Sequence, residues 1–121
     1  MVTGVQTCAL PISFLYAQKG QNLDRALEMA QQLVTAYPND ATTRDTLGWV
    51  FHRAGQHDKA ITCLRQAAAL SPDTGTIQLH LGYALWGAGR RAEGAEALRA
   101  ALQHALPAAE KAEVEKLLAA R

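Results

Sequence analysis

A chain of 121 residues carries 12 Lys and Arg against 11 Asp and Glu, and this net charge of +1 gives no electrostatic reason to expect a nucleic acid or an anionic membrane as partner. Apolar residues make up 49% and aromatic residues 6%, and the apolar ones are mostly Ala and Leu, which favours helices over a sheet. Two cysteines exclude a disulfide framework, and no apolar run reaches the roughly 18 residues of a membrane span, so we expect no direct membrane insertion.

The first segment, residues 1–12, lacks helical periodicity. Residues 2–12 resemble the translation of a common sequencing adapter, so we expect them to be non-native, irregular, and fused to a protein that continues upstream of Ser13. A secretory signal is the alternative, because residues 8–17 are largely apolar. A signal peptide needs a positive start, however, and Lys19 is the first basic residue.

Residues 13–40 are predicted to form a truncated helical pair. Residues 13–19 supply only part of a first helix, whereas Asn22 or Asp24 caps a second helix that Pro38 ends. The apolar face of that second helix is Leu23, Ala26, Leu27, Ala30, Leu33 and Val34. An incomplete partner helix predicts an exposed apolar edge, through which the chain could associate with itself.

Residues 41–74 contain the clearest helical pair. Its first helix is predicted from Ala41 to Ala54 and includes Gly48, although glycine inside a helix costs about 1 kcal/mol relative to alanine. Gly55 permits the left-handed turn, and Asp58 suits the positive start of the second helix. The predicted apolar faces are Leu47, Val50 and Phe51, then Ala60, Ile61, Leu64, Ala67 and Ala68.

Residues 75–107 repeat this plan, with a turn at 87–89 and with Gly94 in the place of Ala60. Residues 108–121 form one more helix, predicted from Ala108 to Ala120. Its narrow apolar stripe consists of Val114, Leu117 and Leu118. Glu110, Lys111, Glu113, Glu115 and Lys116 are predicted to face water. A half-polar terminal helix is typical of the cap of a repeat array.

These units share a period of 34 residues, since Leu47-Gly48 recurs as Leu81-Gly82 and Gly55 as Gly89. The pattern resembles the tetratricopeptide repeat family, whose signature is W-x2-L-G-x2-Y, then A-x3-F, then P. The middle unit carries the matching residues Arg44, Leu47, Gly48, Phe51, Ala60, Leu64 and Pro72. The resemblance implies an all-α, right-handed superhelix of antiparallel helix pairs with a capping helix, in which the first helices line a concave groove.

The resemblance also implies which side chains point into that groove. They are Thr42, Asp45, Trp49, His52, Arg53, Thr76, Leu79, Tyr83 and Trp86. Helical spacing supports one face independently, and Trp, Tyr and Arg are the residue types that most often anchor interfaces. The alternative is that the two tryptophans pack between neighbouring first helices. The Lys, Asn and Arg of the family's carboxylate clamp are absent, so the groove suits an extended or helical peptide of a protein partner.

Catalytic and metal-binding patterns are missing. The histidines His52, His57, His80 and His104 make no i, i+4 metal pair, and we expect them to be solvated or packed. Cys63 has no second cysteine within motif distance and fits a small core or boundary position. We therefore expect no enzyme, no cofactor and no metal.

The predicted function is a non-catalytic protein–protein interaction module. Residues 45–49 and 80–82 resemble the C-terminal end of long bacterial tetratricopeptide proteins, some of which serve exopolysaccharide production or envelope export. That resemblance predicts a fragment of a longer scaffold. The alternative is a structural cap or self-association segment. The sequence shows no targeting signal from which the compartment, cytoplasm or periplasm, could be predicted.

Overall fold

The computed structural model describes residues 22–120, so the segment with the adapter resemblance and the partial helix 13–19 lie outside the described residues. The described chain consists of helices and turns, without a strand. The helices are α2 (Leu23–Ala36), α3 (Ala41–Arg53), α4 (His57–Leu70), α5 (Gly75–Gly87), α6 (Arg91–Leu102) and α7 (Ala108–Ala120). The predicted all-α class is confirmed.

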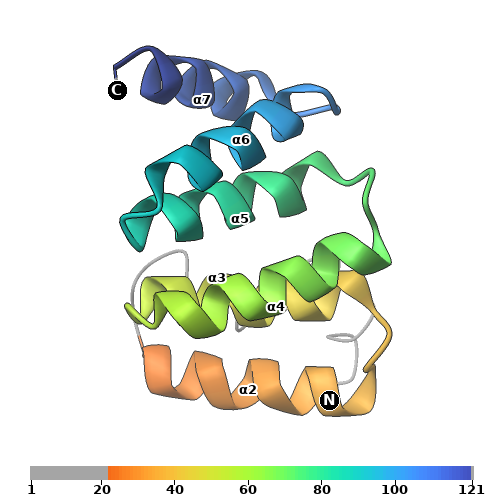
Figure 1. Cartoon of the computed structure of the whole chain (residues 1–121). Coiled ribbons are helices and arrows are strands. Elements are labelled where there is room, and N and C mark those ends of the chain that lie inside the picture. Colours follow the sequence, from red (N-terminus) through yellow and green to blue (C-terminus); the bar gives the residue numbers. More distant parts are fainter. Residues whose placement is uncertain (1–21, 121) are drawn as a thin grey trace.

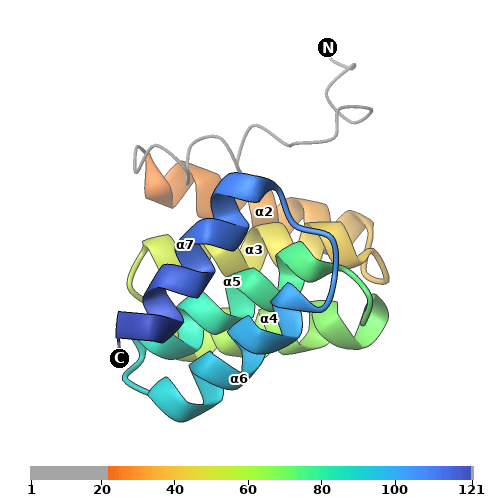
Figure 2. The same ribbon diagram turned by 90° about the horizontal axis from the view of Figure 1, so that it is seen from above.

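The helices stack in layers along the chain, with α2 at one end and α7 at the other (Figure 1). The most extensive contacts join α3 to α4 and α5 to α6, so each predicted pair packs on itself. Further contacts of α2 with α3, α4 with α5, and α3 with α5 hold successive layers together. Seen along the stack, α7 crosses the end of the array (Figure 2).

Helix boundaries follow the local chemistry. Gly55 and Gly89 have φ of 80° and 83°, the left-handed conformation that lets the chain turn after α3 and α5. The Asp40 carboxylate accepts a hydrogen bond from the Thr42 N–H at 2.8 Å and caps α3. The predicted side-chain cap of α2 is wrong in part: Asn22 stands at the N-cap with φ of 48°, and its side chain makes no capping bond within the described residues.

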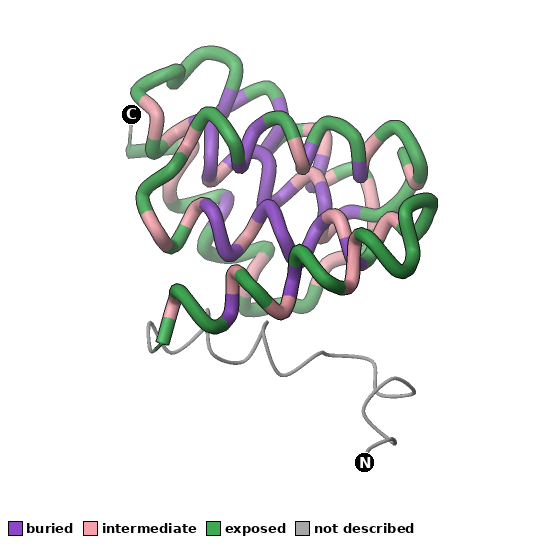
Figure 3. The backbone as a smooth tube through the Cα atoms, turned by 90° about the horizontal axis from the view of Figure 1, so that it is seen from below, coloured by how far each residue is buried: buried purple, intermediate pink, exposed green. Residues whose placement is uncertain are grey.

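The glycines inside the first helices allow close packing within each pair. A Cβ on Gly48 would lie 2.6 Å from Leu64 Cγ, and one on Gly82 would lie 2.5 Å from Leu98 Cδ2. Leu64 of α4 thus packs against Gly48 of α3, and Leu98 of α6 packs against Gly82 of α5 in the same way. The buried residues gather between the layers of the backbone (Figure 3). The fully buried residues extend from Ala26 in α2 to Val114 in α7.

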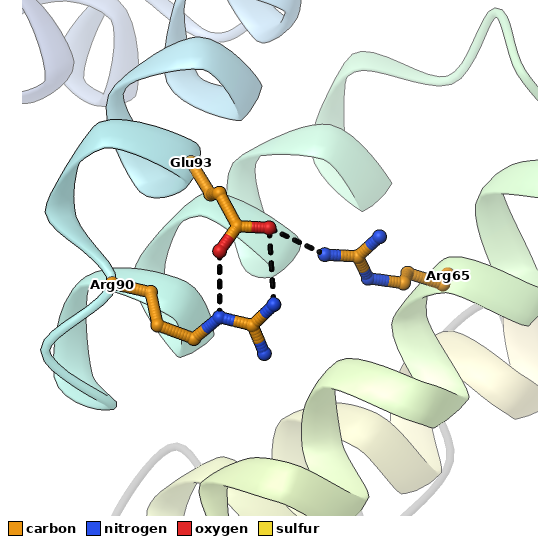
Figure 4. A network of polar contacts seen from close by, with 3 residues as sticks. All are labelled: Arg65, Arg90 and Glu93. Carbon is orange, nitrogen blue, oxygen red and sulfur yellow. Dashed lines mark hydrogen bonds and ion pairs between the residues drawn. The ribbon is translucent and has the colours of Figure 1, made fainter.

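An exposed ion-pair network links α4 to the first turn of α6 (Figure 4). The Arg90 guanidinium donates to both carboxylate oxygens of Glu93 at 2.7 and 3.0 Å, and Arg65 of α4 donates to Glu93 Oε2 at 3.2 Å. The hydrogen bond from Arg90 holds the pKa of the Glu93 carboxyl below its usual range. Because all three groups are exposed, the network contributes little to stability.

Candidate partner-binding groove

Three helices that are not consecutive in the chain, α3, α5 and α7, border an open surface pocket of about 510 Å³. It is lined by Trp49, His52, Tyr83, Trp86, Gly87, Glu113, Lys116, Leu117 and Ala120. The first four of these belong to the groove predicted from the sequence. The layers place them together because α3, α5 and α7 each stand in the first-helix position of their layer.

The aromatic wall of the pocket is a packed series of rings. The Trp49 ring stacks on His80 with centroids 4.4 Å apart, and the Trp49 and Tyr83 centroids are 6.3 Å apart. The Arg91 guanidinium lies 5.0 Å from the Trp86 ring centroid. Both tryptophans are half-buried and pack against core clusters while they line the pocket. Packing between helices and exposure to a pocket therefore coexist in the same side chains.

Helix α7 contributes a wall that the sequence interpretation assigned to water. The Tyr83 hydroxyl donates a 2.9 Å hydrogen bond to Glu113 Oε1. Burial, followed by this bond, raises the pKa of Tyr83, so the phenol is a neutral donor. Glu113 and Lys116 are exposed, as predicted, yet they line the pocket together with Leu117. Their i, i+3 and i+4 spacing is the signal that could have placed them on one face.

Two predicted groove residues are buried below the pocket. Asp45 is 8% exposed, and its Oδ1 lies 2.6 Å from Nδ1 of His80. Leu79 is 1% exposed and packs in a cluster with Leu98 and Val114. The Asp45 carboxylate thus pairs with His80 inside the protein. Neither Asp45 nor Leu79 lines the pocket.

The remaining predicted residues lie outside the pocket lining. Thr42 and Arg53 are exposed, and Thr76 is half-buried. Thr42 stands in the first turn of α3, where its N–H is held by Asp40. The pocket therefore occupies the part of the first helices nearer their C-terminal ends.

Three neighbouring rings each hold a buried nitrogen atom without a hydrogen-bond partner among the described residues. These atoms are Nε1 of Trp49, Nδ1 of His52 and Nδ1 of His57. Burial, followed by the charge interactions with His57, Arg53 and His80, lowers the pKa of His52 to about 4. The His52 imidazole is therefore neutral at pH 7.

Other chemistry is sparse in the described chain. Residues 22–120 contain no cluster of three or more His, Cys, Asp or Glu arranged to hold a metal. Cys63 is half-buried, and burial raises the pKa of its thiol, which opposes nucleophilic use. Within the same residues, none of the helices has the length and apolar character to cross a bilayer.

Comparison of the sequence with known families gives two overlapping matches. Two family models described as tetratricopeptide repeat match residues 15–73 and residues 46–112. A curated relative, "Small glutamine-rich tetratricopeptide repeat-containing protein 2" of Mycosarcoma maydis, is 31% identical over 81 residues. That match covers 67% of this chain and 23% of the relative, so the chain spans less than a quarter of the relative's length.

Solved structures share the fold. The Yersinia enterocolitica type III secretion translocator chaperone SycD superimposes with a TM-score of 0.80 at 23% identity, over 90% of this chain and 77% of that chain. The structure named MamA MSR-1 C2 gives a TM-score of 0.63 at 24% identity, over 75% of this chain and 52% of that chain. At these identities the likeness shows the fold alone, and it confirms the predicted superhelix of helix pairs. The chain is a protein–protein interaction module, and it belongs to the tetratricopeptide repeat family.

Proposed function

We propose that the pocket between α3, α5 and α7 binds a peptide segment of a protein partner. The observation that carries the proposal is the convergence of Trp49, Tyr83 and Trp86 on one pocket. Aromatic anchors in a concave, mostly apolar site are the usual source of binding energy in peptide recognition. Because Asp45 is buried, the polar contacts to the peptide come from Glu113 and Lys116 at the rim.

The wider setting belongs to the same proposal. We infer units at residues 13–40, 41–74 and 75–107 with a capping segment at 108–121, as part of a longer bacterial scaffold. The resemblance of residues 45–49 and 80–82 to envelope and exopolysaccharide export proteins supports that setting. The uninterrupted gene, sequenced with its neighbours, tests it. A gene that begins at residue 1 beside unrelated genes would contradict it.

The binding proposal is tested by selecting peptides from a displayed library on the tag-free chain and measuring their affinity by calorimetry. Trp49→Ala and Trp86→Ala are each expected to weaken selected peptides by about 2 kcal/mol or more. Tyr37→Ala is the matched control, because this aromatic side chain is 50% exposed and lies outside the pocket lining. Equal binding by wild type and both tryptophan variants would refute the proposal.

A second variant separates binding from folding. Ala120 is exposed at the pocket wall, so Ala120→Arg fills the pocket without removing a core side chain. We expect it to abolish peptide binding while the circular dichroism spectrum and melting temperature stay unchanged. Retained affinity in Ala120→Arg would place the peptide elsewhere.

Self-association through the truncated first unit is the second candidate function. The predicted apolar edge of that unit is largely covered, because Ala26 and Ala30 are buried and Leu27 and Val34 pack partly buried against the core. The large apolar side chains that stay exposed in the described chain are Tyr37, 50% exposed at the end of α2, and Leu70, 44% exposed at the end of α4. If copies of the chain meet there, the double variant Tyr37→Ser and Leu70→Ser shifts light scattering from dimer to monomer. Monomeric wild type at all concentrations would remove this candidate.

A further inference from the structure

The charged side chains around the pocket are separated by sign along its length. At one end, Oε1 of Glu113 accepts the 2.9 Å hydrogen bond from the Tyr83 hydroxyl. Glu110, one turn earlier in α7, lies near enough for its charge to act on the same phenol. This end of the pocket therefore already holds two carboxylates, which oppose the approach of a further anion.

Cationic side chains border the other end of the pocket. The helices α5 and α7 run in the same direction (Figures 1 and 2), so Trp86 and Lys116 each lie about one turn beyond the hydrogen bond that joins Tyr83 to α7. Lys116 lines the pocket, and the Arg91 guanidinium stands 5.0 Å from the Trp86 ring centroid. The apolar surface at this end is therefore flanked by two positive charges.

Neither of these cations is neutralised by a carboxylate within the described chain. Among residues 22–120, Lys116 and Arg91 take part in none of the ion pairs, whereas the adjoining Arg90 is held by Glu93. Lys116 also makes no ion pair with Glu113, although the two lie three positions apart on α7. A bound apolar side chain would exclude water from this end and strengthen the attraction of both cations for an anion.

We propose that the peptide bound in the pocket carries an acidic residue next to its apolar anchor, and that this carboxylate faces Lys116 and Arg91 beside Trp86. The inference rests on the proposed function and names the chemistry of its partner. A basic residue in the same place would meet two like charges. A nucleic acid is disfavoured, because its continuous negative charge would also pass Glu110 and Glu113. The charges thus select among peptides that the aromatic wall alone would accept.

The test selects peptides on the tag-free full chain from a displayed library in which acidic and basic residues are equally frequent. We expect the selected peptides to carry Asp or Glu next to a Trp, Phe or Leu anchor. Each selected peptide is then synthesised in two forms, one with the acidic residue and one with the corresponding amide. Calorimetry measures the affinity of both forms at low and at physiological salt.

The acidic form should bind about three- to tenfold more tightly than the amide form, and added salt should reduce that advantage, because mobile ions screen exposed charges. Equal affinities of the two forms would overturn this inference but not the peptide pocket. Binding of no peptide at all would overturn both.

Variants of the protein assign the preference to its residues. Lys116→Gln should remove most of the advantage of the acidic form, and Arg91→Gln should reduce it. Lys111→Gln and Arg99→Gln are the matched controls, because these exposed cations of α7 and α6 lie outside the pocket lining. Lys116→Glu should reverse the preference, so that the same anchor binds more tightly beside lysine than beside glutamate. An unchanged advantage in Lys116→Gln, or its loss in Lys111→Gln, would rule out the assignment.

A second copy of the chain is the alternative occupant of the pocket, and sedimentation of the same preparations distinguishes it. Ala120→Arg, which fills the pocket, should leave the oligomeric state of the chain unchanged. Wild-type dimers that dissociate in Ala120→Arg would assign the pocket to a second copy and overturn the proposal.

Discussion

Nδ1 of His80 and Oδ1 of Asp45 lie 2.6 Å apart in a buried contact between α5 and α3, across 35 positions of the sequence. The Trp49 ring stacks on the same His80, so one polar pair and one aromatic contact join two layers below the pocket. A polar pair withdrawn from water in this way is destabilising to break, because the remaining partner stays buried.

We predict that Asp45→Ala destabilises the protein by about 1–3 kcal/mol, since it leaves His80 without its carboxylate. Urea denaturation measures the change. Asp73→Ala is the control, because Asp73 is exposed in a turn and its loss should stay within about 0.5 kcal/mol. A double-mutant cycle with His80→Ala isolates the pair from the stacking of His80 on Trp49. A coupling energy near zero would contradict the prediction.

Alanine at position 48 is predicted to destabilise the protein, although alanine favours a helix by about 1 kcal/mol over glycine. The new Cβ would lie 2.6 Å from Leu64 Cγ, and overpacking of this kind costs about 1–3 kcal/mol. Thermal melts of Gly48→Ala test this result. In a Leu64→Ala background the clash is gone, so the same substitution should become neutral or stabilising. A higher melting temperature for Gly48→Ala alone would show that the helices do not approach as described.

Acid should destabilise the fold through His52. Its folded pKa of about 4 lies below the ordinary value of 6.5, so the unfolded chain binds more protons between these two pH values. Its contribution to stability is therefore full above pH 6.5 and is lost as the pH falls towards 4. The groups that face it are His57 of α4, Arg53 of α3 and His80 of α5. Chemical denaturation in metal-free buffer at pH 7 and pH 4.5 should show a smaller difference for His52→Gln than for wild type; an equal difference would assign the acid sensitivity elsewhere.

Removing the Tyr83 hydroxyl should loosen α7 more than it lowers global stability. Tyr83→Phe deletes the hydrogen bond to Glu113, an exposed contact worth about 0.5–1.5 kcal/mol. Amide hydrogen exchange in α7 should accelerate, whereas exchange in α3 should change little. Glu113→Ala should reproduce the effect, and Glu115→Ala, which alters an exposed neighbour, should not. Uniform acceleration in all helices would contradict a local role.

The helices were largely predictable because their signals are local. The expected range of α7 agrees with the structure, α3 ends one residue before the predicted Ala54, and α4 begins at His57 rather than Asp58. Glycine turns and apolar spacing depend on neighbouring residues, and both are visible in a single sequence. The close approach of α3 and α4 at Gly48 could also be predicted, because this glycine inside a helix recurs one period later as Gly82.

The site was only partly predictable, because it depends on contacts between layers. Helical spacing predicts that Trp49 lies on one face of the first helix of the middle unit, and that Tyr83 and Trp86 share a face of the first helix of the next unit. It does not predict that Asp45 is paired with His80. A carboxylate on a helix looks exposed until its partner is known, and that partner lies in another unit. The pocket wall from α7 was missed for a similar reason, since its polar residues fit a solvated cap equally well.

The contacts at Gly48 and Gly82 are alike in the two helix pairs. By themselves these contacts would allow the two repeat units to change places in the stack. The contact between Asp45 and His80 prevents this, because its counterpart one period later is apolar: Leu79 and Val114, also 35 positions apart, share one buried cluster. Moving the middle unit next to α7 would set Asp45 against Val114, where no imidazole could receive the carboxylate. These two interfaces between layers therefore differ in polarity, and this difference favours the observed order of the units.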